Sequence, residues 1–189
     1  MRKLNSIIGP AIIILLLIHG IWGAFQLTSI VPGGSTVRQV LSHVMVTLVI
    51  VHIIIGIKLT IDTLLAIRRS GASYWKGNEL FWIRRVSGLA LIVLIVYHML
   101  VFMTSSGEIF RLNTFGGLQL AGHILLVIAL IVHLAANIRP LCIALGIADR
   151  RYVRDVMIIL SILLAVCAAA FVFYYLRWNF LWRYGGPGL

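Results

Sequence analysis

The residues of this chain best able to do chemistry are its six histidines, all of which fall inside long apolar segments. They are His19, His43, His52, His98, His123 and His133. An ionisable side chain at membrane depth is energetically costly, so each is a candidate functional group if these segments span a membrane. The alternative for any one of them is a packing role, in which the imidazole hydrogen-bonds a neighbouring helix.

Five apolar runs hold these histidines, and each is long enough to cross a bilayer, which takes about 20 residues. They cover residues 6–28, 40–67, 83–104, 117–139 and 153–177. Hydrophobic residues make up 61% of the 189 residues and charged residues 11%, whereas soluble domains are about 45–50% apolar. The sequence therefore predicts an all-α integral membrane bundle, one transmembrane domain over residues 1–189 with five spanning helices.

The net charge of +11 predicts orientation rather than nucleic-acid binding, because the cations are unevenly distributed. If the helices alternate in direction, 11 of the 16 Lys and Arg residues fall on the side of the N-terminus and four on the other, with Lys58 inside the second run. Cytoplasmic connections carry such an excess. We expect a cytoplasmic N-terminus, an outside C-terminus and the connections 68–85 and 140–153 inside.

His19 and His98 are predicted to lie at one depth. His19 follows Ser6 by 13 residues, and His98 follows Arg85 by 13. At a rise of 1.5 Å per residue, each is roughly 20 Å from the inner edge. They form an outer layer.

His52 and His133 are predicted to form an inner layer. Each lies six residues before an inward-side cation, Lys58 and Arg139 respectively, and so roughly 9 Å from the inner edge. Each layer thus draws its pair from two helices that run in the same direction.

Two imidazoles that meet inside a bundle are natural axial ligands of a b-type haem. Zinc fits less well, because it takes three or four protein ligands and each layer offers two. The two cysteines, Cys142 and Cys167, form no CxxCH motif, so any haem is held without thioether bonds. We predict two haems b.

His43 and His123 lie nine and ten residues outward of the inner pair. A rival arrangement pairs them with each other between the same two helices. Nine residues turn a helix by about half a revolution, so His43 and His52 face opposite ways, and the rival leaves the outer pair without a role. We expect His43 and His123 to neighbour the outer haem or a quinone pocket, with packing as the alternative.

Gly23 and Gly56 each follow a predicted ligand by four residues and so share its helical face. Glycine lets a flat porphyrin approach the backbone, although it also serves ordinary packing of membrane helices.

The segment NELFWIRRVSGLALIVLIVYHM, residues 78–99, resembles the cytochrome b membrane anchor of succinate dehydrogenases and fumarate reductases, of the five-helix, single-subunit, di-haem type. RKLNSIIG, VHIIIGI and VHLAANI are similar to the other ligand segments of that family. The resemblance implies that His19 and His98 hold the outer haem, and that His52 and His133 hold the inner one.

The resemblance also implies a flavoprotein and an iron–sulfur subunit on the cytoplasmic face of a bacterial inner membrane. Those subunits carry the succinate and fumarate chemistry of the enzyme complex. This chain would be its electron-transfer and quinone-reactive subunit, surrounded by lipid, with menaquinone as the quinone of the di-haem type.

Haem propionates require cations or hydrogen-bond donors, and the candidates on the inner side are Arg85, Ser87, Lys58 and Arg139. The alternatives are an i,i+4 ion pair of Lys58 with Asp62 and snorkelling of the arginines to the interface.

The chain departs from the family at its proton groups. Some members have a glutamate in the first outer loop and another two residues before the ligand in the fourth helix. Here the loop has no acid and Ile131 precedes His133 by two. Glu108, His43 and His123 are the remaining candidates to protonate a quinone, and the alternative for Glu108 is a solvated loop residue.

Two other functions are compatible with the sequence. One is the cytochrome b subunit of a hydrogenase or formate dehydrogenase, whose catalytic subunits usually lie on the outer face. The other is a haem-free membrane transporter or assembly protein whose histidines are packing groups.

Overall fold

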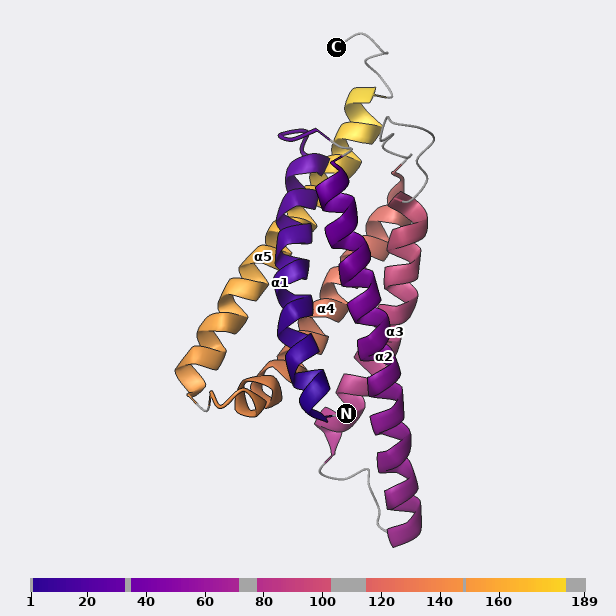
Figure 1. Cartoon of the computed structure of the whole chain (residues 1–189). Helices are drawn as coiled ribbons and strands as arrows, with labels where there is room; N and C mark the ends of the chain where they lie inside the picture. The colour runs from indigo at the N-terminus through magenta and orange to yellow at the C-terminus, as the bar shows by residue number, and fades with distance from the viewer. Residues whose placement is uncertain (1, 33–34, 72–77, 103–114, 148, 183–189) are drawn as a thin grey trace.

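The computed structural model describes residues 2–32, 35–71, 78–102, 115–147 and 149–182, which form a bundle of long helices without β-strands (Figure 1). The helices are α1 (Arg2–Leu27), α2 (Thr36–Ser70), α3 (Glu79–Phe102), α4 (Gly117–Ala144) and α5 (Arg150–Leu176), followed by the short π-helix η1 (Arg177–Trp182). All five α-helices are long and apolar enough to cross a membrane. The predicted all-α fold and its five candidate spans are confirmed.

Successive helices run in opposite directions, and several extend beyond the apolar runs that marked them (Figure 1). α2 begins at Thr36 rather than at residue 40 and ends at Ser70 rather than at 67. Hydropathy marks only the part of a helix that lies in lipid, whereas backbone hydrogen bonding continues into the polar flanks. α2 ends at Gly71, whose φ of 66° is a left-handed conformation that glycine adopts without a steric penalty.

α4 continues past the predicted end at residue 139, through Pro140, to Ala144. Proline has no backbone N–H, so the carbonyl of the residue four positions earlier loses its helical donor. That carbonyl belongs to Ala136, and it accepts a hydrogen bond of 2.9 Å from Arg84 Nε on α3. The replacement bond explains how the helix continues through the proline and ties α3 to α4.

The core is concentrated around α4 and α5. α4 packs against α3 and α5, and α1 packs against α2 and α5, whereas the buried residues of α2 and α3 are few: Ile55, Ser87 and Leu91. The pairs α1 with α3 and α2 with α4 make few backbone contacts. Those are the helix pairs that carry the two layers of histidines, so the layers lie between helices that are not closely packed together.

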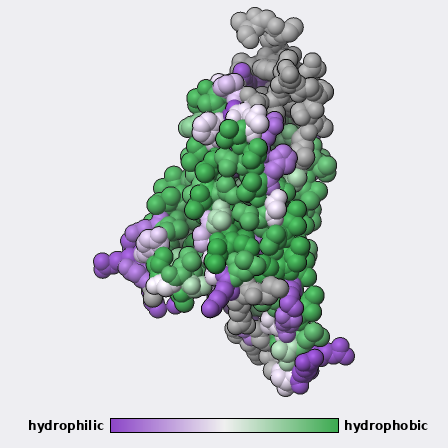
Figure 2. All heavy atoms as spheres, viewed as in Figure 1, coloured by the Kyte–Doolittle hydropathy of each residue, from purple (hydrophilic) through white to green (hydrophobic). Residues whose placement is uncertain are grey.

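On the face shown in Figure 2, the middle of the surface is apolar. Hydrophilic residues gather mainly at the end of α2 and around the start of α5, where Arg68, Arg69, Arg150 and Arg151 are exposed. An apolar surface this large is unfavourable in water. The five long helices and this apolar band are those of a multi-pass membrane protein.

Candidate functional site

The structure brings the four layered histidines together as two pairs. The ring centroids of His19 on α1 and His98 on α3 lie 6.0 Å apart with an interplanar angle of 79°. Those of His52 on α2 and His133 on α4 lie 6.4 Å apart at 86°. Each pair joins the two helices that the depth calculation selected.

The spacing of each pair fits one metal ion held between two imidazole nitrogens. A metal–nitrogen bond is about 2 Å long, as for zinc, and a ring nitrogen lies about 1 Å from its centroid, so two opposed ligands have centroids about 6 Å apart. Among the described residues, no group of three or more His, Cys, Asp or Glu side chains could hold a metal ion. A metal bound by one of these pairs therefore needs its other positions filled by a non-protein ligand, as a porphyrin does for haem iron.

In the inner layer, the hydroxyl of Ser87 sets the tautomer of His133. Ser87 Oγ lies 2.6 Å from the carbonyl of Ile83 and 3.1 Å from His133 Nδ1. A hydroxyl has one proton, and the shorter bond shows that Ser87 donates it to the carbonyl, so Ser87 accepts from Nδ1–H. The lone pair of His133 is then on Nε2 and free for a metal. The sequence had suggested Ser87 only as a propionate partner.

Arg85 is the cation of the inner layer. It is close enough to His52 and His133 to act on both electrostatically, and its guanidinium lies 5.0 Å from the ring centroid of Phe81. His52 Nδ1 is buried and has no hydrogen-bond partner in the described part of the chain. Arg85 and Ser87 are thus the two predicted propionate groups that lie beside the inner pair.

The other two predicted propionate groups have different surroundings. Lys58 Nζ lies 3.9 Å from Asp62 Oδ2, and both side chains are more than half exposed, at 53% and 57%. This is the ion pair that the sequence offered as the alternative. Arg139 is exposed on α4.

In the outer layer, a hydroxyl again accompanies one histidine. His19 Nδ1 lies 3.3 Å from Ser42 Oγ on α2. Ser42 was not among the residues predicted from the sequence. The signal that could have indicated it is a small polar residue within an apolar span, next to His43. The Nδ1 atom of His98, the other member of the pair, is buried without a hydrogen-bond partner among the described residues.

His123 is the third histidine of the outer layer and is fully buried, with 0% of its surface exposed. Its ring centroid lies 5.2 Å from that of His98 and 4.6 Å from that of Phe171 on α5. Phe102 and Phe115 complete the surrounding aromatic shell, at 5.2 and 5.3 Å. The sequence predicted His123 as a neighbour of the outer pair but did not reveal this shell, because hydropathy does not say which face of α5 meets α4.

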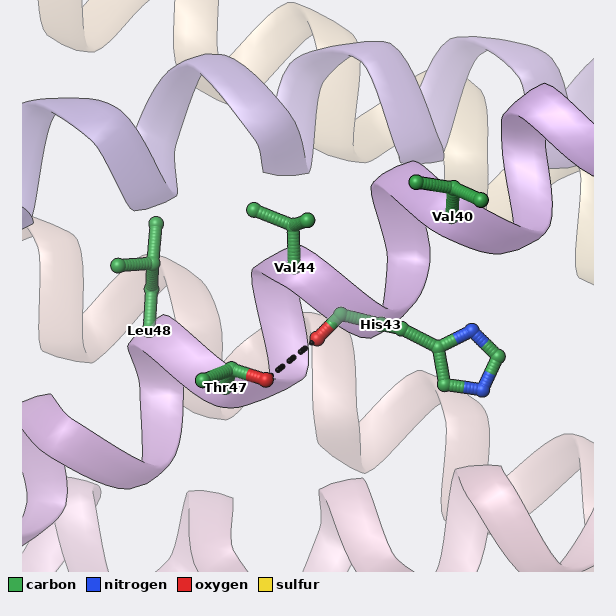
Figure 3. A pocket seen from close by; sticks show the side chains of 5 residues that line it. All are labelled: Val40, His43, Val44, Thr47 and Leu48. Carbon is green, nitrogen blue, oxygen red and sulfur yellow. Dashed lines mark hydrogen bonds between the residues drawn. The ribbon is translucent and has the colours of Figure 1, made fainter.

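His43 lies apart from this cluster, on an exposed face of α2. Its Nδ1 is 2.7 Å from the carbonyl of Gln39. It lines a shallow pocket with Val40, Val44, Thr47 and Leu48, all on the same helix (Figure 3). In the part of the chain that the structure describes, no ring contact joins His43 to His123, so the rival pairing has no support. Glu108 lies outside the described residues.

The two glycines beside the predicted ligands face open space. Among the described residues, a Cβ added at Gly23 or Gly56 would meet no heavy atom within 4 Å beyond its chain neighbours and the backbone of its own helix. Gly20, which lies on α1 with Gly23, differs because a Cβ there would lie 3.1 Å from Cys167 Sγ. Gly20 is thus a packing glycine, whereas no neighbouring helix in the described structure packs against the Cβ positions of Gly23 and Gly56.

No family model, curated protein or solved structure matches this chain. The fold and the site define a class only: a helical, multi-pass membrane protein with two pairs of histidines at different depths.

Proposed function

We propose that this chain is a di-haem cytochrome b, the membrane anchor subunit of a succinate:quinone oxidoreductase. The observation that carries the proposal is the spacing of the two pairs, 6.0 Å for His19 with His98 and 6.4 Å for His52 with His133. Open space at Gly23 and Gly56 supports a large planar group at each pair. The resemblance of residues 78–99 to the family of succinate dehydrogenase anchors supports the identity of the complex.

The four histidines would each supply one axial nitrogen, and two haems b bound there would supply one-electron transfer between an iron–sulfur subunit and a membrane quinone. Ser87 accepts from Nδ1–H of His133, which would leave Nε2 as the metal-binding nitrogen and raise its basicity. Ser42 contacts Nδ1 of His19. The positive charge of Arg85 favours the reduced form of the inner iron and suits a propionate.

The cationic ends of α2, α3 and α5 support a cytoplasmic N-terminus and an outside C-terminus. A flavoprotein and an iron–sulfur subunit would then dock on the inner face of a bacterial cytoplasmic membrane, next to the inner pair. The quinone, menaquinone by resemblance, would react towards the outer side, where His43 and Glu108 are the proton candidates. His123, the third candidate from the sequence, is fully buried.

The test is native purification of the full-length chain from its own membranes, with haem quantification and identification of the subunits that co-purify. We expect two haems b per chain, together with a flavoprotein and an iron–sulfur protein. A control variant is His43→Ala, which should retain both haems because His43 is exposed and belongs to neither pair.

Each other outcome points to a different function. A protein without reduced b-type absorption would be a haem-free transporter or assembly protein. Two haems with partners that lack a flavin would indicate the cytochrome b of a hydrogenase or formate dehydrogenase. Either result contradicts the proposal.

A further inference from the structure

Two buried nitrogens of the outer layer lack hydrogen-bond partners among the described residues, and they belong to neighbouring rings. They are Nδ1 of His98 and Nε2 of His123. The two ring centroids are 5.2 Å apart, with an interplanar angle of 66°. A buried polar atom without a partner loses its hydrogen bond to water and gains nothing in return, so two of them side by side require an explanation.

The surroundings of His123 decide which of its nitrogens carries the proton. His123 Nδ1 lies 2.6 Å from the carbonyl oxygen of Gln119. A carbonyl only accepts, so Nδ1 must be the donor. In a neutral imidazole the other nitrogen then has a lone pair, which makes Nε2 of His123 a buried acceptor that needs a donor.

His98 would supply that donor when it binds iron. On the function proposed above, on which this inference rests, His98 Nε2 binds the metal and Nδ1 keeps its proton. A metal-bound histidine almost always donates its second ring N–H to an acceptor. We propose that His123 Nε2 accepts this hydrogen bond and is therefore the positioning residue of the outer ligand, held in turn by the carbonyl of Gln119.

The ring distance permits this bond. Each facing nitrogen lies about 1 Å from its centroid, so a separation of 5.2 Å leaves about 3 Å between them, within hydrogen-bond range. No hydrogen bond joins the two nitrogens in the described structure, so at least one ring must rotate for the bond to form. His123 would then do for His98 what Ser87 does for His133.

Tyr97 is the competing donor to His123. Its hydroxyl is also buried without a partner among the described residues, and its ring centroid lies 5.8 Å from that of His123. The tyrosine ring rests on Gly122, where an added Cβ would come within 2.4 Å of Tyr97 Cε1. Tyr97→Phe keeps this packing and removes only the hydroxyl, so it is the matched control.

The experiment is a redox titration of both haems in the full-length protein, with the inner haem as internal reference. His123→Leu removes the acceptor at similar volume and makes His98 a weaker electron donor to iron. At a fixed potential, the ratio of reduced to oxidised outer haem should rise roughly tenfold, equivalent to an upward shift of about 59 mV for one electron. In His123→Gln, whose amide oxygen can accept in place of Nε2, the potential of the outer haem should return towards the wild-type value. Tyr97→Phe should change this potential little.

The inference is overturned if His123→Leu leaves the outer potential unchanged, or if Tyr97→Phe moves it equally. It is also overturned if both His123 variants lose the outer haem, because His123 would then serve packing rather than acceptance. Fewer than two haems in the wild-type protein would instead refute the proposed function, before any substitution is made.

Discussion

The inner and outer layers present the same pair of imidazoles in different surroundings. The inner pair has a serine hydroxyl on His133 and the guanidinium of Arg85 nearby. The outer pair has a third histidine, His123, which is fully buried within an aromatic shell. If each pair holds a haem as proposed, the ligands are identical and a difference between the two sites would come from these neighbours. A nearby cation favours the reduced iron, and a strong acceptor on a ligand N–H favours the oxidised iron. The comparison therefore predicts that the inner haem has the higher potential.

The largest effect should come from removing one ligand of either layer. His133→Ala should abolish the inner haem and spare the outer one, and His98→Ala should do the reverse, because each layer draws on a different helix pair. Haem content should fall from about two to about one per chain, measured from the reduced-minus-oxidised spectrum of the purified protein. If either substitution removes both haems or neither, the two layers are not independent sites.

A smaller effect should follow when the charge of the inner layer is removed. Arg85→Gln should lower the potential of the inner haem by some tens of millivolts and leave the outer one unchanged, since the guanidinium acts on both inner histidines and interactions of this kind tune haem potentials. Redox titration of the two haems measures this change in the potential of the inner haem. Arg139→Gln, at an exposed position on α4, is the control, and a similar shift there would mean that net charge rather than position sets the potential.

The smallest effect should be at Lys58. Its pair with Asp62 is exposed and 3.9 Å long, and such pairs contribute about 0–1 kcal/mol. Lys58→Ala should change the thermal midpoint of the purified protein little and leave both haem potentials in place. A clear fall in inner haem content would show that Lys58, and not only Arg85 and Ser87, contributes to holding the inner group.

Much of the fold could be predicted from the sequence, and the errors of that prediction were at helix ends. The five apolar runs located the five helices, because lipid requires about 20 apolar residues whatever the packing. The ends were set too short at Thr36 and Ser70, since backbone hydrogen bonds extend a helix into polar sequence that hydropathy does not detect. The passage through Pro140 depended on Arg84 from another helix, a contact that no pattern within the fourth run could reveal.

By itself, the sequence predicted how far along its helix each histidine lies, because position along a helix axis increases linearly with residue number. That was sufficient to sort four of them into two layers and to predict which helices share a layer. Rotation about the helix axis and the choice of neighbours depend on how all five helices pack together, so only the tertiary structure decided the partners of each imidazole. It placed Ser42 on His19, Ser87 on His133, and His123 beside His98 in an aromatic shell drawn partly from α5.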